Sequence, residues 1–220
     1  MDNAEYQREA LNQSAFDMLT LCTSQLEKAI EAFISHDSDL SEEVIHRENR
    51  VNAMDIKIEK DCEKFLALFT PVAVDLRFIM AILKINSDLE RIGDHAFNIA
   101  SYVVEEDKAI PAHLFEAVEF EKMHETTKSM MDNITVAFEE KDVKMARKVF
   151  KKDKVLDKIN IKSFKILEME IQKDQTIIKE ALFLFSVIKK MERVGDLIKN
   201  IAEEIIFYTD AEILKHKRKK

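Results

Sequence analysis

A twelve-residue segment that occurs twice constrains this chain more than any other feature of its sequence. Residues 89–100 read LERIGDHAFNIA and residues 191–202 read MERVGDLIKNIA, and seven of the twelve positions are identical. Ordinary composition gives a chance match at roughly one position in twenty. The chain therefore contains an internal repeat, and its two halves are expected to fold alike.

The two glycines of the chain, Gly93 and Gly195, occupy the same place in the two copies. Glycine inside a helix costs about 1 kcal/mol relative to alanine, so its presence there predicts a use. We expect either a close approach of another backbone or space for a ligand beside the helix. The alternative is that duplication simply copied a glycine that has no role.

The scarcity of turn residues predicts the fold class. Two glycines and two prolines in 220 residues leave little turn chemistry for a β protein, which needs a turn every dozen residues or so. Helical spacing of apolar residues predicts six long helices instead, over residues 5–34, 41–70, 71–106, 112–140, 143–173 and 176–214. Ser41 is the expected N-cap of the second helix, and Pro71 is expected in the first turn of the third.

The order of the helices repeats as well. Each half has two helices followed by a third that carries the duplicated segment, and residues 107–111 interrupt the pattern between them. We therefore predict an all-α protein of two tandem three-helix bundles, with domains at 1–108 and 109–220.

Composition excludes several classes of function. A net charge of −8 and a pI near 5.4 argue against a nucleic-acid surface, which needs clustered positive charge. No run of about 18 uncharged apolar residues could span a membrane, and the N-terminus lacks a signal-peptide pattern. Cys22 and Cys62 are too far apart for a zinc or disulfide framework, so the sequence favours a cytoplasmic protein.

Oxygen-bearing side chains recur four residues apart in both halves, which places each pair on one side of a helix. The four pairs are Glu48 with Asn52, Glu90 with Asp94, Asp153 with Asp157, and Glu192 with Asp196. Such pairs are common by chance in an acidic chain. Their recurrence at matching places, 102 residues apart for the main motif and 105 for the upstream one, is what makes them candidates for metal ligands.

The main acidic pairs are expected to face solvent. In the third helix the apolar stripe consists of Ile85, Leu89, Ile92, Ala96, Ile99 and Val103, and Glu90 and Asp94 fall on the opposite side. The sixth helix repeats this arrangement. A metal held there would lie on the surface, and carboxylate and amide ligands suit Fe(III), Mn, Mg or Ca. Solvated acidic faces without a metal are the alternative.

A helical wheel cannot say whether the pairs at Glu48 and Asp153 reach the acidic pairs of the following helices. His95 follows Asp94 but has no counterpart, because Leu197 takes its place, so we expect an exposed polar residue there and not a ligand.

The motifs resemble a known family. Residues 88–96, preceded by Pro71 to Arg77, resemble the first-repeat signature of the PhoU family, and residues 191–196 resemble the second. The resemblance covers nearly the whole chain. It implies a negative regulator of phosphate uptake and of the phosphate-starvation response, an adaptor between the ATPase subunit of the phosphate ABC transporter and a sensor histidine kinase at the membrane. It also implies surface metal clusters on some members and a homodimer or larger assembly.

Four charged residues of these motifs are candidates for partner contacts or for fixing neighbouring carboxylates, and they are Asp75, Arg77, Arg91 and Arg193. Two departures make the halves unequal: Asn52 stands where an acidic residue would complete its motif, and the charges of Asp75 and Arg77 have no match around Ile177 and Ile178. We expect no catalysis. The alternatives are a carboxylate-bridged di-metal hydrolase or oxidoreductase and a helical scaffold that holds no ion.

Overall fold

The computed structural model describes residues 3–211, and within that range every regular element is a helix, as the sequence predicts. The elements are α1 (Asn3–Ser35), α2 (Ser38–Leu68), α3 (Ala73–Glu105), α4 (Ala112–Ala117), α5 (Phe120–Glu140), α6 (Val143–Lys173), the 3₁₀ helix η1 (Gln175–Ile177) and α7 (Ile178–Asp210). None of these helices is both long enough and apolar enough to cross a membrane.

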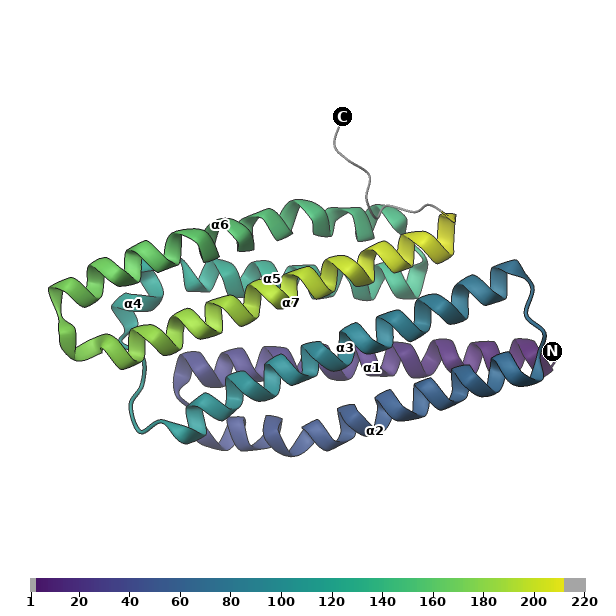
Figure 1. The fold of residues 1–220 in the computed structure, drawn as a ribbon, viewed down its shortest axis with the longest axis horizontal. Helices are drawn as coiled ribbons and strands as arrows, with labels where there is room; N and C mark the ends of the chain where they lie inside the picture. The colour runs from purple at the N-terminus through teal and green to yellow at the C-terminus, as the bar shows by residue number, and fades with distance from the viewer. Residues whose placement is uncertain (1–2, 212–220) are drawn as a thin grey trace.

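Four helices form a layer and two long helices cover one side of it. The layer runs α2, α3, α7, α6, and each of these helices contacts the next (Figure 1). Behind it, α1 packs on α2 and α3, and α5 packs on α6 and α7. Each half is thus a three-helix bundle, and the two helices that carry the duplicated segment, α3 and α7, meet at the centre.

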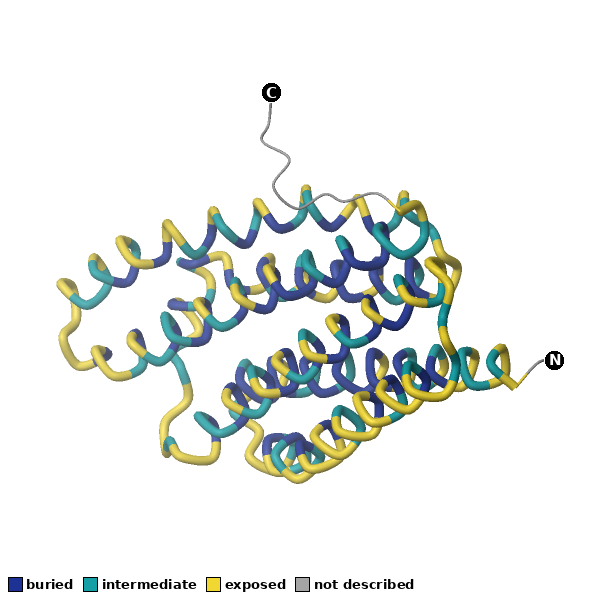
Figure 2. The backbone as a smooth tube through the Cα atoms, turned by 45° about the vertical axis from the view of Figure 1, so that its right-hand side comes forward, coloured by how far each residue is buried: buried dark blue, intermediate teal, exposed yellow. Residues whose placement is uncertain are grey.

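The predicted apolar stripes form the core. All six stripe residues of α3 are buried, as are their counterparts in α7, which are Val187, Met191, Val194, Ile198, Ile201 and Ile205. Figure 2 shows buried residues on the inward side of each helix and exposed residues along the outward side. The 3.6-residue period therefore gave the correct orientation of both helices.

Contacts across the α3–α7 boundary join the halves into one body. The hydroxyl groups of Tyr102 and Ser186 share a hydrogen bond of 2.9 Å. Lys84 Nζ lies 3.1 Å from both carboxylate oxygens of Glu204, whose side chain is almost fully buried. The rings of Tyr102 and Phe183 also pack with their centroids 5.1 Å apart.

The single helix predicted over residues 112–140 is wrong, because the chain breaks it between α4 and α5. Glu119 has a left-handed backbone with φ 56°. On a continuous helix Phe115 and Phe120 would point about 140° apart, yet both rings pack on Phe33 with centroid distances of 5.8 Å. The break lets both aromatic side chains reach the same place in the core.

Other helix ends differ by a few residues from the prediction. Asp37, and not Ser41, caps α2, because its side chain accepts a hydrogen bond from the backbone N–H of Leu40 at 3.0 Å, and Ser41 is buried inside the helix. Pro71 precedes α3 instead of lying in its first turn. The sixth predicted helix starts through η1, and its predicted end at Leu214 lies outside the described residues.

Candidate functional site

Each glycine lies where two helices touch. A Cβ atom added at Gly93 would lie 2.8 Å from Val51 Cγ1, and one added at Gly195 would lie 2.5 Å from Leu156 Cδ1. Carbon atoms in contact are normally 3.5–4.0 Å apart, so neither position has room for a side chain without movement. Both glycines therefore allow close packing of two helices, but the nearest atoms belong to side chains of the neighbouring helix and not, as the sequence led us to expect, to its backbone.

This packing places the pairs that begin at Glu48 and Asp153, on α2 and α6, beside the acidic pairs of α3 and α7. The added Cβ atom at Gly93 would lie 3.6 Å from Glu48 Oε2, and at Gly195 it would lie 3.6 Å from Asp153 Oδ1. The match confirms the 105-residue offset between α2 and α6. It also answers the question left open by the helical wheel, because Glu48 and Asp153 do reach the acidic pairs of α3 and α7.

The first cluster consists of Glu48 from α2 with Glu90 and Asp94 from α3. Glu48 is 9% exposed, and neither of its carboxylate oxygens has a hydrogen-bond partner of ordinary geometry. Burial, followed by the negative charges of Asp94 and Glu90 and a hydrogen-bonding effect of Asp94, raises the pKa of Glu48 to about 7. A hydrogen-bonding effect of Asn52 lowers this pKa in part. Burial and Asp94 also raise the pKa of Glu90. The carboxylates of this cluster thus disfavour one another's charge, and at Glu90 the positive charge of Arg91 opposes this only in part.

The second cluster contains its own cation. It consists of Asp153 and Asp157 from α6 with Glu192 and Asp196 from α7. Lys199 Nζ donates to Asp153 Oδ2 at 2.9 Å and also to Asp196 Oδ1. Burial opposes the charge of Lys199, but the hydrogen bonds to Asp196 and Asp153 outweigh burial and raise its pKa. Asp153, which is nearly fully buried, therefore has a cationic hydrogen-bond partner, whereas no cation is bonded to Glu48.

The remaining predicted ligands lie at the edges of the clusters. Asn52 is exposed and acts on Glu48, as described above. Asp157 is half-buried, and its charge contributes to the raised pKa of Glu192, behind burial and Asp196. Glu90 and Glu192 are half-buried, and Asp94 and Asp196 are exposed. The main acidic pairs of α3 and α7 thus lie outward of the buried stripes, as the wheel predicts.

The donor chemistry fits a hard cation better in the first cluster than in the second. The first cluster has three carboxylates, and its buried carboxylate has no cation bonded to it. Oxygen ligands of this kind suit Mg, Ca, Mn or Fe(III). Across residues 3–211, however, no three acidic, histidine or cysteine side chains are already arranged to hold an ion. Metal binding would need rotation of these side chains, and the metal ligands stay a prediction.

A polar pocket lies between the two main motifs. Residues from equivalent places on α3 and α7 surround a cavity of about 320 Å³, which is lined by Arg91, Asp94, His95, Asn98, Arg193, Asp196, Leu197 and Asn200. The sequence did not reveal this pocket, because only the contact of α3 with α7 brings the two motifs together. His95 is half-buried and not exposed as expected. Burial, then the charges of Lys190 and Arg193, lower the pKa of His95 to about 4.

The predicted partner residues lie in different settings. Arg91 and Arg193 are exposed at the pocket, and Arg91 Nη1 lies 3.7 Å from Asp88 Oδ1. Asp75 pairs with Arg8 from α1 at 3.4 Å, and Arg77 is half-buried near the start of α3.

The loss of charge in the second half is smaller than the sequence comparison indicated. Offset by 102 residues, Asp75 corresponds to Ile177 but Arg77 corresponds to Lys179. Only the carboxylate is therefore lost, and Lys179 pairs with Glu106. Sequence reasoning also missed Lys199. Its spacing of three residues from Asp196 signals a pair on one helix, but its reach to Asp153 depends on how α6 packs on α7.

Comparison with known proteins gives one consistent match. The family model described as the PhoU domain matches residues 16–103 and 120–205. The phosphate-specific transport system accessory protein PhoU homolog of Aquifex aeolicus is 34% identical over 208 residues, which span 94% of this chain and 93% of that protein. The PhoU protein of Escherichia coli is 31% identical over 214 residues, with 97% and 87% coverage. The crystal structure of PhoU from Pseudomonas aeruginosa superposes with a TM-score of 0.88 at 28% identity, covering 94% of this chain and 99% of that one.

Proposed function

We propose that this chain, which belongs to the PhoU family, is a non-catalytic accessory protein that regulates phosphate uptake. Its relatives are named as accessory proteins of the phosphate-specific transport system, which supports such a role. The finer proposal is that it represses the phosphate-starvation response as an adaptor between the ATPase subunit of the phosphate ABC transporter and a sensor histidine kinase. The cytoplasmic location and the homodimer or larger assembly stay predictions.

Exposed apolar side chains at equivalent places in the two halves support docking. Leu76 and Met80 near the start of α3 correspond, at the 102-residue offset, to Ile178 and Leu182 near the start of α7, and all four are exposed. Met80 is 42% exposed and Leu182 is 61% exposed. Single exposed apolar residues are ordinary, but a repeated set in a duplicated unit marks a surface that both halves use.

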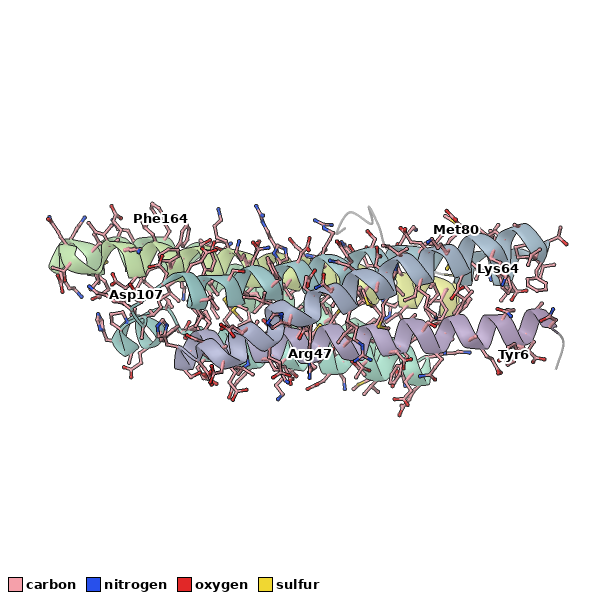
Figure 3. The ribbon with its side chains drawn as sticks, turned by 90° about the horizontal axis from the view of Figure 1, so that it is seen from below. Tyr6, Arg47, Lys64, Met80, Asp107 and Phe164 are labelled. Atoms are coloured by element: carbon pink, nitrogen blue, oxygen red, sulfur yellow. The ribbon has the colours of Figure 1, made fainter. Side chains whose placement is uncertain are left out.

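These residues share one face of the molecule with the polar pocket. On α3, Leu76, Met80, Arg91 and Asp94 point within about 60° of one another at 100° per residue, and α7 repeats the pattern. We call this surface the docking face: the outward sides of α3 and α7 with the pocket at its centre and the two apolar pairs at opposite ends. Met80 and Phe164 lie on the same side of the molecule and Tyr6 on the other (Figure 3).

The face therefore has a polar centre between two apolar ends. An adaptor could bury the apolar ends against partner helices, while the charged centre fixes the orientation of the partner. Asp75, Arg77, Arg91 and Arg193 stay the proposed partner contacts, and the last two line the centre. A metal ion bound to the clusters of Glu48, Asn52, Glu90 and Asp94 or of Asp153, Asp157, Glu192 and Asp196 would neutralise acidic charge beside the face and so favour docking.

Binding of the purified ATPase subunit and of the cytoplasmic part of the kinase tests the proposal directly. The double variant Met80→Glu with Leu182→Glu places a charge at each apolar end, and we expect its affinity for a partner to fall by tenfold or more. Tyr6→Glu is the matched control, because Tyr6 is similarly exposed on α1 on the other side. Equal affinity of the double variant and the wild type would contradict the docking face, and failure of the wild type to bind either partner would contradict the adaptor role.

A further inference from the structure

The two acidic clusters differ in one residue that changes what they can bind. Lys199 of α7 corresponds to Phe97 of α3 at the 102-residue offset. The lysine ammonium lies between Asp153 and Asp196, whereas an aromatic ring cannot offset the charge of Glu48. We propose that Lys199 fills, in the second cluster, the place that a divalent cation takes in the first, so that each chain binds one metal ion, at Glu48, Glu90 and Asp94.

The two clusters do not differ in total charge. The second cluster has an additional carboxylate, because Asp157 stands where the first has Asn52, and Lys199 compensates for it. The two clusters then have the same formal charge. They differ in where the positive charge lies: the innermost carboxylate of the second cluster, Asp153, is already joined to a cation, and the innermost carboxylate of the first, Glu48, is not.

The burial of these two carboxylates makes the difference matter. Asp153 is 7% exposed and Glu48 is 9% exposed, so water can stabilise neither charge fully. An ion that enters the first cluster gains a buried carboxylate beside which no ammonium group lies. An ion that enters the second must first displace an ammonium group that makes two charge-assisted hydrogen bonds. The first cluster should therefore bind a hard divalent cation with the higher affinity.

This inference rests on the metal-binding part of the proposed function and is tested separately from partner binding. Protein stripped with a chelator is dialysed against Mn²⁺, and bound metal per chain is measured by elemental analysis. We expect one ion for the wild type. Glu48→Gln should abolish binding, while the matched change Asp153→Asn in the second half should leave one ion bound.

Removal of the internal ammonium should create a second site. Lys199→Met retains the length of the side chain without its charge, and we expect two ions per chain. Lys189→Met, a change at an exposed lysine of the same helix, is the control and should leave one ion. The reciprocal variant Phe97→Lys should bind none, with circular dichroism confirming that it folds.

Each contrary outcome has a distinct meaning. Two ions bound to the wild type, or one ion that Asp153→Asn removes and Glu48→Gln does not, would overturn the assignment of Lys199 while leaving metal binding in place. If the Lys199→Met variant still binds one ion, the assignment of Lys199 is overturned as well. A wild type that binds none would overturn both this inference and the metal-binding part of the proposed function, and the adaptor role would still be decided by partner binding.

Discussion

The two glycines offer a quantitative test of how the clusters are assembled, because the same substitution should have unequal effects in the two halves. Alanine at either position gains about 1 kcal/mol in helix propensity but adds a Cβ atom to a closed interface. The added Cβ atom would lie 2.8 Å from Val51 Cγ1 at position 93 and 2.5 Å from Leu156 Cδ1 at position 195. To reach an ordinary carbon contact of about 3.5 Å, Val51 Cγ1 must therefore move by about 0.7 Å and Leu156 Cδ1 by about 1.0 Å.

The smaller overlap should nevertheless cost more. Val51 is β-branched and in a helix keeps essentially one χ1 rotamer. Its overlap with the new Cβ atom at position 93 can therefore be removed only if α2 and α3 move apart. Leu156 Cδ1 is the end of a longer side chain and can rotate away. Overpacking costs roughly 1–3 kcal/mol. We therefore expect Gly93→Ala to lower the free energy of unfolding by about 1–2 kcal/mol after the gain in propensity, and Gly195→Ala by less than about 1 kcal/mol.

Equilibrium urea unfolding followed by circular dichroism measures both effects. A double-mutant cycle isolates the contact: Val51→Ala makes room for the new methyl group, so the double variant should be more stable than the sum of the single changes by about 0.5–3 kcal/mol. Stabilisation of the chain by both glycine substitutions, at the value of propensity alone, would refute the close packing of α2 on α3 and of α6 on α7.

Two further predictions concern the helix ends and the join between the halves. Asp37 and Asp142 cap α2 and α6, because their side chains accept hydrogen bonds from backbone N–H groups. Asp37→Ala and Asp142→Ala should each lower the free energy of unfolding by about 1 kcal/mol. An unchanged urea midpoint for either variant would contradict the stabilising role of that cap. Lys84→Met removes the ion pair to the buried side chain of Glu204 at the α3–α7 boundary. Because Lys84 is itself half exposed, we expect the free energy of unfolding to fall by about 1–2 kcal/mol. Unchanged thermal stability would show that this pair does not help to join the halves.

The sequence was informative wherever one helix can be considered by itself. Apolar residues every three or four positions gave the inward side of α3 and α7, and all the stripe residues are buried. The repeat gave two equivalent halves, and the scarcity of glycine made Gly93 and Gly195 conspicuous. These inferences need only the period of a helix and the cost of glycine within it.

Features that depend on contacts between helices were not predictable in the same way. The break at Glu119 has no glycine or proline to signal it. It accompanies the packing of Phe115 and Phe120 on Phe33, a contact between distant parts of the chain. The pocket of Arg91 and Arg193 depends on α3 meeting α7. Lys199 could be paired with Asp196 from spacing alone, but its bond to Asp153, which makes the two clusters unequal, follows from the packing of α6 on α7.

Anomalous diffraction from crystals grown with Mn²⁺ would locate the metal and so test most directly whether the glycine-packed helices build a cation site in only one half. We expect a single strong peak beside Glu48, Glu90 and Asp94, with Lys199 still bonded to Asp153. A peak beside Asp153 and Asp196 with Lys199 displaced, or no peak at either cluster, would contradict this expectation.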